Sequence, residues 1–184
     1  MMNFEELDSI TRKWMLEEFN KEWSQKNHYE SKNLNEEGLI AFPELMKKAI
    51  QNGTIESLTK GLSKPSLWNS TKTRRAKSGT ISMKLNPQTE SKMLAHSEFN
   101  TWYTRGFARR LLEENENECE VYRADKAAQP HCECTSLEGT KQPVEKIYNG
   151  HRKKYFPKDN PTAFSIPSVV YCHHTIRRAI KENQ

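Results

Sequence analysis

The sequence has no apolar run that approaches the roughly 20 residues needed to cross a bilayer. Its first residues, Met1 to Leu7, also lack the basic and apolar regions of a secretory signal peptide. These two absences predict a protein that has no membrane partner and is made in a reducing compartment. In such a compartment, closely spaced cysteines more often indicate a metal site than a disulfide.

Apolar residues are scarce for a self-sufficient globule. They make up 34% of the 184 residues, whereas charged residues make up 29%. A chain of this length is one domain, or one domain with an appendage, and it can bury a core without disulfides. The low apolar content nevertheless predicts extended parts that are stabilised by partners.

Acidic residues are absent from residues 61–85, which contain six lysines and arginines. Within this stretch, residues 63–79 are rich in serine and threonine, and we expect an extended, exposed basic loop. Uncompensated positive charge favours contact with nucleic acid or an acidic protein surface, with a solvated loop as the simpler alternative. The candidate contact residues are Lys72, Arg74, Arg75 and Lys77.

Helical spacing of apolar residues dominates the first 62 residues. It predicts an amphipathic helix over 3–24, a second helix that opens at Phe42-Pro43 and ends near Gly53, and a short third helix over 55–62. The first helix carries large aromatic side chains that need a surface to bury them. That surface is either the protein's own core or another subunit, and the candidate docking residues are Trp14, Phe19 and Trp23.

A long helix is predicted from Pro87 to about Asn115, with Asn86 as its N-cap. Phe99, Tyr103, Phe107 and Leu111 form one i, i+4 row that we expect to be core. Alternation predicts strands over 80–85 and 118–124, and short strands are expected near 143–147 and 168–176.

The predicted fold class is therefore α+β, with N-terminal helices, one long central helix and a small, loop-rich β part at the C-terminus. We expect two regions, a helical region at 1–85 that includes the basic loop and an α+β domain at 86–184.

Two short segments hold most of the cysteines and half of the histidines. They are "PHCEC" at 130–134 and "CHH" at 172–174. Zinc prefers about four nitrogen or sulfur ligands, which proteins supply as two closely spaced pairs. The candidate ligands of a structural zinc ion are His131, Cys134, Cys172 and His174. Cys132 and His173 are alternatives because they neighbour the chosen residues, and His151 is a further alternative.

Other interpretations of the two segments stay open. The alternatives are that the segments pack against each other without metal, form a redox-sensitive disulfide, or take part in catalysis. The fourth cysteine, Cys119, lies in a predicted strand and is most simply a small buried hydrophobe.

The order of motifs in the second half resembles the C-terminal domain of the phage Mu F-like minor head proteins, over about residues 91–178. The motifs are "LAHSEFN" on the long helix, "EVYRAD" on the following strand, "HCECTSLEG", "QPVEKIY" and the closing "CHHTIRR". That family carries Cys-x-x-Cys, Leu-Asp-Gly and a closing Cys-x-Cys. In this chain His131 and His174 stand at two of the four cysteine positions, His96 replaces the arginine of the helix motif, and the histidine-proline before the closing pair is missing.

This resemblance implies a virion protein, made in the host cytoplasm, that belongs to the head near the portal. It implies a structural role in head assembly or completion, oligomeric contacts with portal or capsid proteins, contact with packaged DNA, and no catalytic residues.

Two alternatives of other classes remain. A small metal-dependent nuclease would use His151 as a general base, with His173 and a carboxylate of Asp125, Glu133 or Glu138 nearby. The sequence shows no DH or HNH spacing that would favour it. A DNA-binding phage regulator or inhibitor would use the basic loop, but no helix-turn-helix pattern is present.

Overall fold

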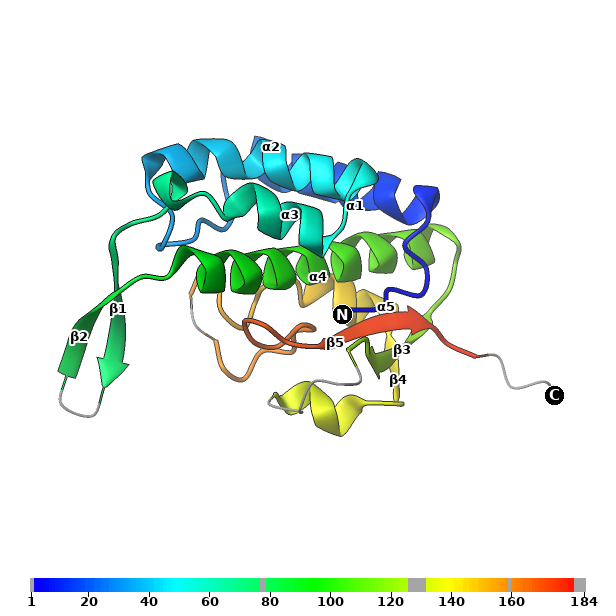
Figure 1. The fold of residues 1–184 in the computed structure, drawn as a ribbon. Helices are drawn as coiled ribbons and strands as arrows, with labels where there is room; N and C mark the ends of the chain where they lie inside the picture. The colour runs from blue at the N-terminus through cyan, green and yellow to red at the C-terminus, as the bar shows by residue number, and fades with distance from the viewer. Residues whose placement is uncertain (1, 77–78, 126–131, 159, 181–184) are drawn as a thin grey trace. The chain divides into compact units, whose positions relative to one another are not determined.

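The computed structural model describes residues 2–76, 79–125, 132–158 and 160–180, with the backbone alone at 74–76. It belongs to the α+β class, as predicted, and it contains the long central helix (Figure 1). Within the described residues, no helix combines the length and apolar character needed to cross a membrane.

The chain forms two compact units, one of residues 1–28 with 100–184 and one of residues 29–99. The long helix α4, Pro87–Glu113, contributes to both. The division predicted from the sequence, into residues 1–85 and 86–184, stays a prediction.

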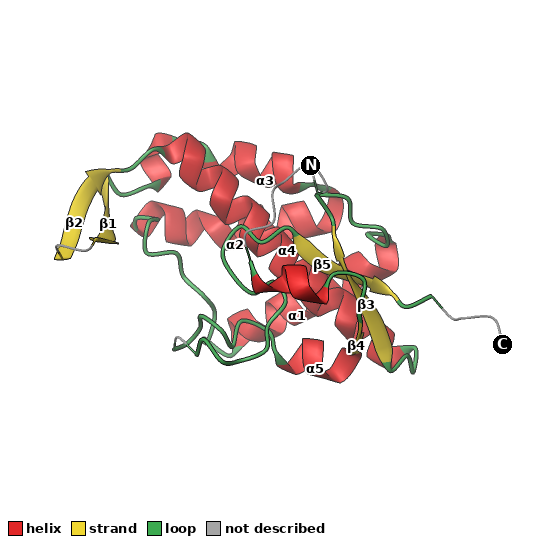
Figure 2. Ribbon diagram, turned by 90° about the horizontal axis from the view of Figure 1, so that it is seen from below, coloured by secondary structure: helices red, strands yellow, loops and turns green. Residues whose placement is uncertain are grey.

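The first unit contains helix α1 (Ser9–Ser24), the second part of α4 and a three-stranded antiparallel sheet (Figure 2). The strand order is β4-β3-β5, with β3 at Glu118–Arg123, β4 at Lys141–Pro143 and β5 at His174–Arg178. The short helices η2 (Glu133–Leu137) and α5 (Val144–Asn149) complete this unit.

The core of the first unit lies between α1, α4 and the sheet. Phe19 of α1 has no exposed surface and its ring lies edge-on to Trp102 of α4 at 5.1 Å between centroids. The row predicted on the long helix is confirmed as core, because its four side chains have no exposed surface. Tyr103, Phe107 and Leu111 belong to this unit, and Phe99 belongs to the second. Gly106 lets the two helices approach closely, since a Cβ there would lie 2.5 Å from the backbone nitrogen of Met15.

The second unit contains α2 (Glu36–Asn52), α3 (Ile55–Leu62), η1 (Pro65–Leu67) and the hairpin of β1 (Thr71–Ala76) with β2 (Gly79–Lys84). Helix α3 has the predicted bounds, and Thr54 and Ser57 close a capping box at its start. Helix α2 begins earlier than predicted. Its N-cap is Asn35, whose side chain accepts from the Gly38 N–H at 2.9 Å, so Pro43 lies inside the helix.

Three further sequence expectations were wrong in detail. The stretch 63–79 is not a uniformly exposed loop, because Trp68 is buried and donates its indole N–H to Leu62 O at 2.7 Å. The segment after Pro143 is helix α5, whose Val144 and Ile147 are buried one helical turn apart. The final strand begins only at His174, since Tyr171 has a positive φ of 63° that is incompatible with a strand.

Candidate metal centre

Two chain segments bring the candidate ligands together in the first unit. Cys132 and Cys134 lie at the start of η2, and Cys172 and His174 lead into β5. Strand β5 is fixed beside β3, where His174 pairs with Arg123 and the Ala124 N–H donates to His173 O at 2.9 Å. The sheet therefore holds Cys172 and His174, which we call the closing pair. The short helix η2 holds Cys132 and Cys134.

Four ligand atoms gather at this point, and all lie within 4.8 Å of one another. Cys132 Sγ lies 3.3 Å from both Cys172 Sγ and His174 Nδ1, and Cys172 Sγ lies 3.8 Å from Cys134 Sγ. A tetrahedral zinc ion with Zn–S bonds of about 2.3 Å would place its sulfur ligands about 3.8 Å apart. Three thiols and one imidazole at these separations fit such an ion.

A second layer of contacts orients the imidazole of His174. Its Nε2 lies 3.3 Å from Glu138 Oε2, and the Glu138 carboxylate lies 3.5 Å from Nε of Arg123. A carboxylate on the distal ring nitrogen fixes the histidine tautomer so that the other nitrogen can bind a metal. In this arrangement Nδ1 of His174 faces the three sulfur atoms.

The backbone around the closing pair is also held in place. The His174 N–H donates to Cys172 Sγ at 3.4 Å, a contact that favours a thiolate. Asn100 of α4 is fully buried and its side-chain amide donates to Cys172 O at 3.0 Å and His174 O at 2.9 Å. One buried side chain therefore fixes the carbonyls on both sides of His173.

Hydrogen bonds among the three thiols couple their ionisation. Hydrogen bonds from Cys134 and Cys172, helped by His174, hold the pKa of Cys132 far below its ordinary value. Hydrogen bonding to Cys132 raises the pKa values of Cys134 and Cys172. A bound cation would stabilise the deprotonated form of all three thiols.

Three of the four predicted ligands meet here, namely Cys134, Cys172 and His174. The fourth member of the cluster is Cys132, which the sequence offered as an alternative ligand, and His131 lies outside the described residues. His173, the other alternative, is buried with its ring 5.0 Å from that of Tyr171.

Sequence reasoning missed the supporting roles of Glu138 and Asn100. The signals were present, because Glu138 belongs to the Leu-Glu-Gly motif and Asn100 ends the helix motif quoted above. The spacing of residues alone does not reveal that either side chain reaches the closing pair.

The candidate nucleic-acid residues lie on or near the hairpin of the second unit. Lys72 forms an ion pair with Glu90, which is largely buried and also accepts from the Asn33 side chain at 2.8 Å. Arg74 and Arg75 pair with Ile81 and Thr80 in the hairpin register. Lys77 lies outside the described residues.

The candidate docking residues of α1 differ in their surroundings. Phe19 is fully buried in the protein's own core, so it cannot contact a second subunit in this conformation. Trp14 is half-buried beneath the guanidinium of Arg109, and Trp23 stacks on His28 with 4.1 Å between ring centroids. The structure therefore favours the core alternative for Phe19.

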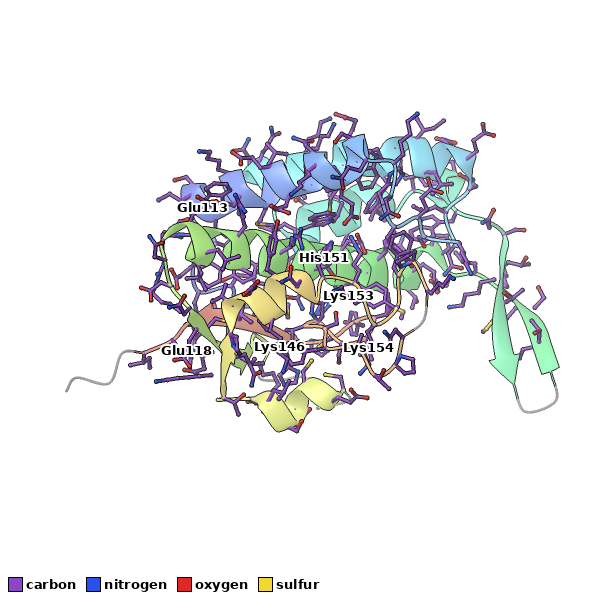
Figure 3. All side chains as sticks on the ribbon, turned by 180° about the vertical axis from the view of Figure 1, so that it is seen from behind. Glu113, Glu118, Lys146, His151, Lys153 and Lys154 are labelled. Atoms are coloured by element: carbon purple, nitrogen blue, oxygen red, sulfur yellow. The ribbon has the colours of Figure 1, made fainter. Side chains whose placement is uncertain are left out.

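His151, the general base of the nuclease alternative, follows α5 and is largely buried (Figure 3). Its Nε2 lies 2.8 Å from Glu22 Oε2, and burial lowers its pKa to about 4. The imidazole is therefore neutral at pH 7 and is engaged by a carboxylate of α1.

Acidification should weaken the fold through this residue. The unfolded chain takes up a proton on His151 near pH 6.5, whereas the folded chain does so only near pH 4. The contribution of this group to the free energy of unfolding is complete above pH 6.5 and is lost as the pH falls to about 4. The total loss is roughly 3 kcal/mol. Urea unfolding of the parent protein and of His151→Gln at pH 7 and pH 5 measures the effect. An equal loss in both proteins would contradict this assignment.

Comparison of the chain with protein-family models, with curated proteins and with solved structures found no match.

Proposed function

We propose that the chain is a structural protein of a tailed-phage head, placed near the portal, with a structural zinc ion in its C-terminal part. The observation that carries the proposal is the meeting of two distant segments at one point, with four ligand atoms within 4.8 Å. These are the segments on which the resemblance to minor head proteins depends. The glutamate of the Leu-Glu-Gly motif and the asparagine of the helix motif both support this cluster.

The donor set supports a structural role more than a catalytic one. Four protein ligands complete the coordination of a tetrahedral ion, and catalytic zinc sites keep one position for water or substrate. The nuclease alternative gains no such support, because its base, His151, is largely buried against Glu22. The proposed partners are portal or capsid subunits, in an oligomeric assembly.

Zinc content is the direct test of the metal. Protein purified without added metal should contain about one zinc per chain, because three thiols and one imidazole form a complete tetrahedral set. Elemental analysis together with the loss of free-thiol reactivity measures this. Folded protein with less than a tenth of an equivalent, and with no uptake of added Zn²⁺, would contradict the proposal.

The place in the virion requires a separate test. Phage particles induced from the strain that encodes the chain should retain it through density-gradient purification, and mass spectrometry of head fractions measures its presence. Recovery of the chain only from the soluble fraction would overturn the virion assignment. That outcome would leave the metal centre unaffected.

A further inference from the structure

The β1–β2 hairpin presents two chemically different faces. The strands pair antiparallel over six positions, from Thr71 opposite Lys84 to Ala76 opposite Gly79. Directly paired residues lie on the same face of a ribbon, and successive pairs alternate between faces. One face therefore carries only hydroxyl and cationic residues, which are Thr71, Thr73, Arg75, Thr80, Ser82 and Lys84. We call this set the hydroxyl face.

The hairpin is open to solvent. All six residues of β2 are exposed, as are Thr71 and Thr73 of β1. It projects away from α2 and α3, which belong to the same unit (Figures 1 and 2). The opposite face carries Lys72 and Arg74 together with the apolar residues Ile81 and Met83, which are 45% and 39% exposed. Five residues of the hydroxyl face are thus described as exposed, namely Thr71, Thr73, Thr80, Ser82 and Lys84. A strand of six residues spans about 20 Å.

The base of the hairpin is fixed to its own unit. The ion pair of Lys72 with Glu90 ties β1 to the first turn of α4, and the Leu85 N–H donates to Ser70 O at 3.0 Å. Lys72, one of the candidate contact residues, therefore serves first as an anchor. A ribbon held in this way loses less conformational freedom when it binds than a loose loop would.

We infer that the hydroxyl face binds duplex DNA through its phosphates. Hydroxyl and cationic side chains donate hydrogen bonds to phosphate oxygens, and a two-stranded ribbon is narrow enough to enter the major groove. Residues 61–85 contain no carboxylate that would repel the backbone. A protein partner would instead match the exposed apolar side chains of the opposite face. The inference rests on the proposed function only for the identity of the DNA, which would be packaged DNA.

We expect binding that is independent of base sequence, because contacts to phosphates carry no sequence information. The paired strands contain no asparagine or glutamine, the side chains that read adenine, and we assign their arginine and lysine residues to phosphates and not to guanine. Two duplexes of unrelated sequence should therefore bind with affinities within a few-fold of each other at the same salt concentration.

The test is the salt dependence of binding to a 25-base-pair duplex, measured by fluorescence anisotropy between about 50 and 200 mM salt. The double variant Arg75→Gln/Lys84→Gln should lower the slope of log affinity against log salt by about 2, because each lost phosphate contact removes about 0.9. A matched control, Lys48→Gln/Lys60→Gln on α2 and α3, changes the net charge equally and should keep the parent slope. The variant Ile81→Thr/Met83→Thr on the opposite face should also keep it.

Three results would overturn the inference. They are no binding of the parent at about 50 mM salt, an equal loss of slope in the hairpin variant and the helix control, or loss of binding only in Ile81→Thr/Met83→Thr. Failure here is distinct from failure of the proposed function. A chain that binds DNA as described but is absent from particles loses only its virion assignment, whereas a virion chain that does not bind DNA loses only this inference.

Discussion

Replacement of Cys172 by alanine should abolish stoichiometric zinc binding and lower the midpoint of thermal unfolding by about 8–16 °C. Cys172 is buried at the centre of the cluster, 3.3 Å from Cys132 Sγ and 3.8 Å from Cys134 Sγ. When the free metal concentration is about a thousand times the dissociation constant of the site, binding stabilises the fold by about 4 kcal/mol. Each kcal/mol corresponds to about 2–4 °C in a chain of this size.

We expect a large effect because a metal at this site would tie the short turn at η2 to the segment that leads into β5. Cys132 and Cys134 belong to a short turn, and Cys172 follows an irregular stretch that ends at β5. Hydrogen bonds to Cys132 and Cys134 raise the pKa of Cys172, and a bound cation would oppose this by stabilising the thiolate. Differential scanning calorimetry with and without a chelator measures the contribution directly.

Cys119→Ala is the matched control. Cys119 is fully buried in β3 and outside the cluster, and burial raises its pKa to about 12, so it remains a protonated thiol. Its loss should leave zinc content unchanged and cost far less stability. Cys172→His supplies a second test that retains a ligand and should keep part of the metal affinity. If a chelator leaves the unfolding midpoint of the parent unchanged, the cluster has no structural metal.

Substitution of Gly106 by alanine should destabilise the protein by about 3 kcal/mol, although alanine is the better helix former. A Cβ at this position would lie 2.5 Å from Met15 N and 2.7 Å from Met15 Cα. Because both atoms belong to the backbone of α1, the overlap can be removed only by a shift of the whole helix. That shift would disturb the packing of Phe19 against Trp102.

Gly61→Ala on α3 provides the comparison for this substitution. Its new Cβ would meet mainly Cδ2 of Leu45, at 2.8 Å, which is the end of a flexible side chain that can rotate away. The gain in helix propensity, about 1 kcal/mol, should offset the remaining strain. Urea unfolding of both variants separates the two cases, and equal stability losses would show that the approach of α1 to α4 is not tight.

Much of the helical structure could be predicted from local sequence patterns. Asn86 and Pro87 mark the start of α4, and the capping residues around Thr54 mark the start of α3, because capping depends on neighbours in the sequence. Short apolar segments were ambiguous, and the turn of helix at Val144–Asn149 was predicted as a strand. A run of a few apolar residues satisfies either periodicity, so only its contacts decide.

The residues alone indicated the class of the fold and the two segments that supply the candidate metal centre, which together hold three cysteines and three histidines. They did not indicate the set of three thiols and one histidine, since the predicted ligands were two cysteines and two histidines. Only the tertiary structure decided that Cys132 completes the described cluster, that Glu138 and Asn100 support it, and that Phe19 is core. The two kinds of information differ in the sequence separation over which the interactions act. Capping and periodicity act over a few residues, whereas the pairing of β3 with β5 and the reach of Asn100 join residues about 50 to 75 positions apart.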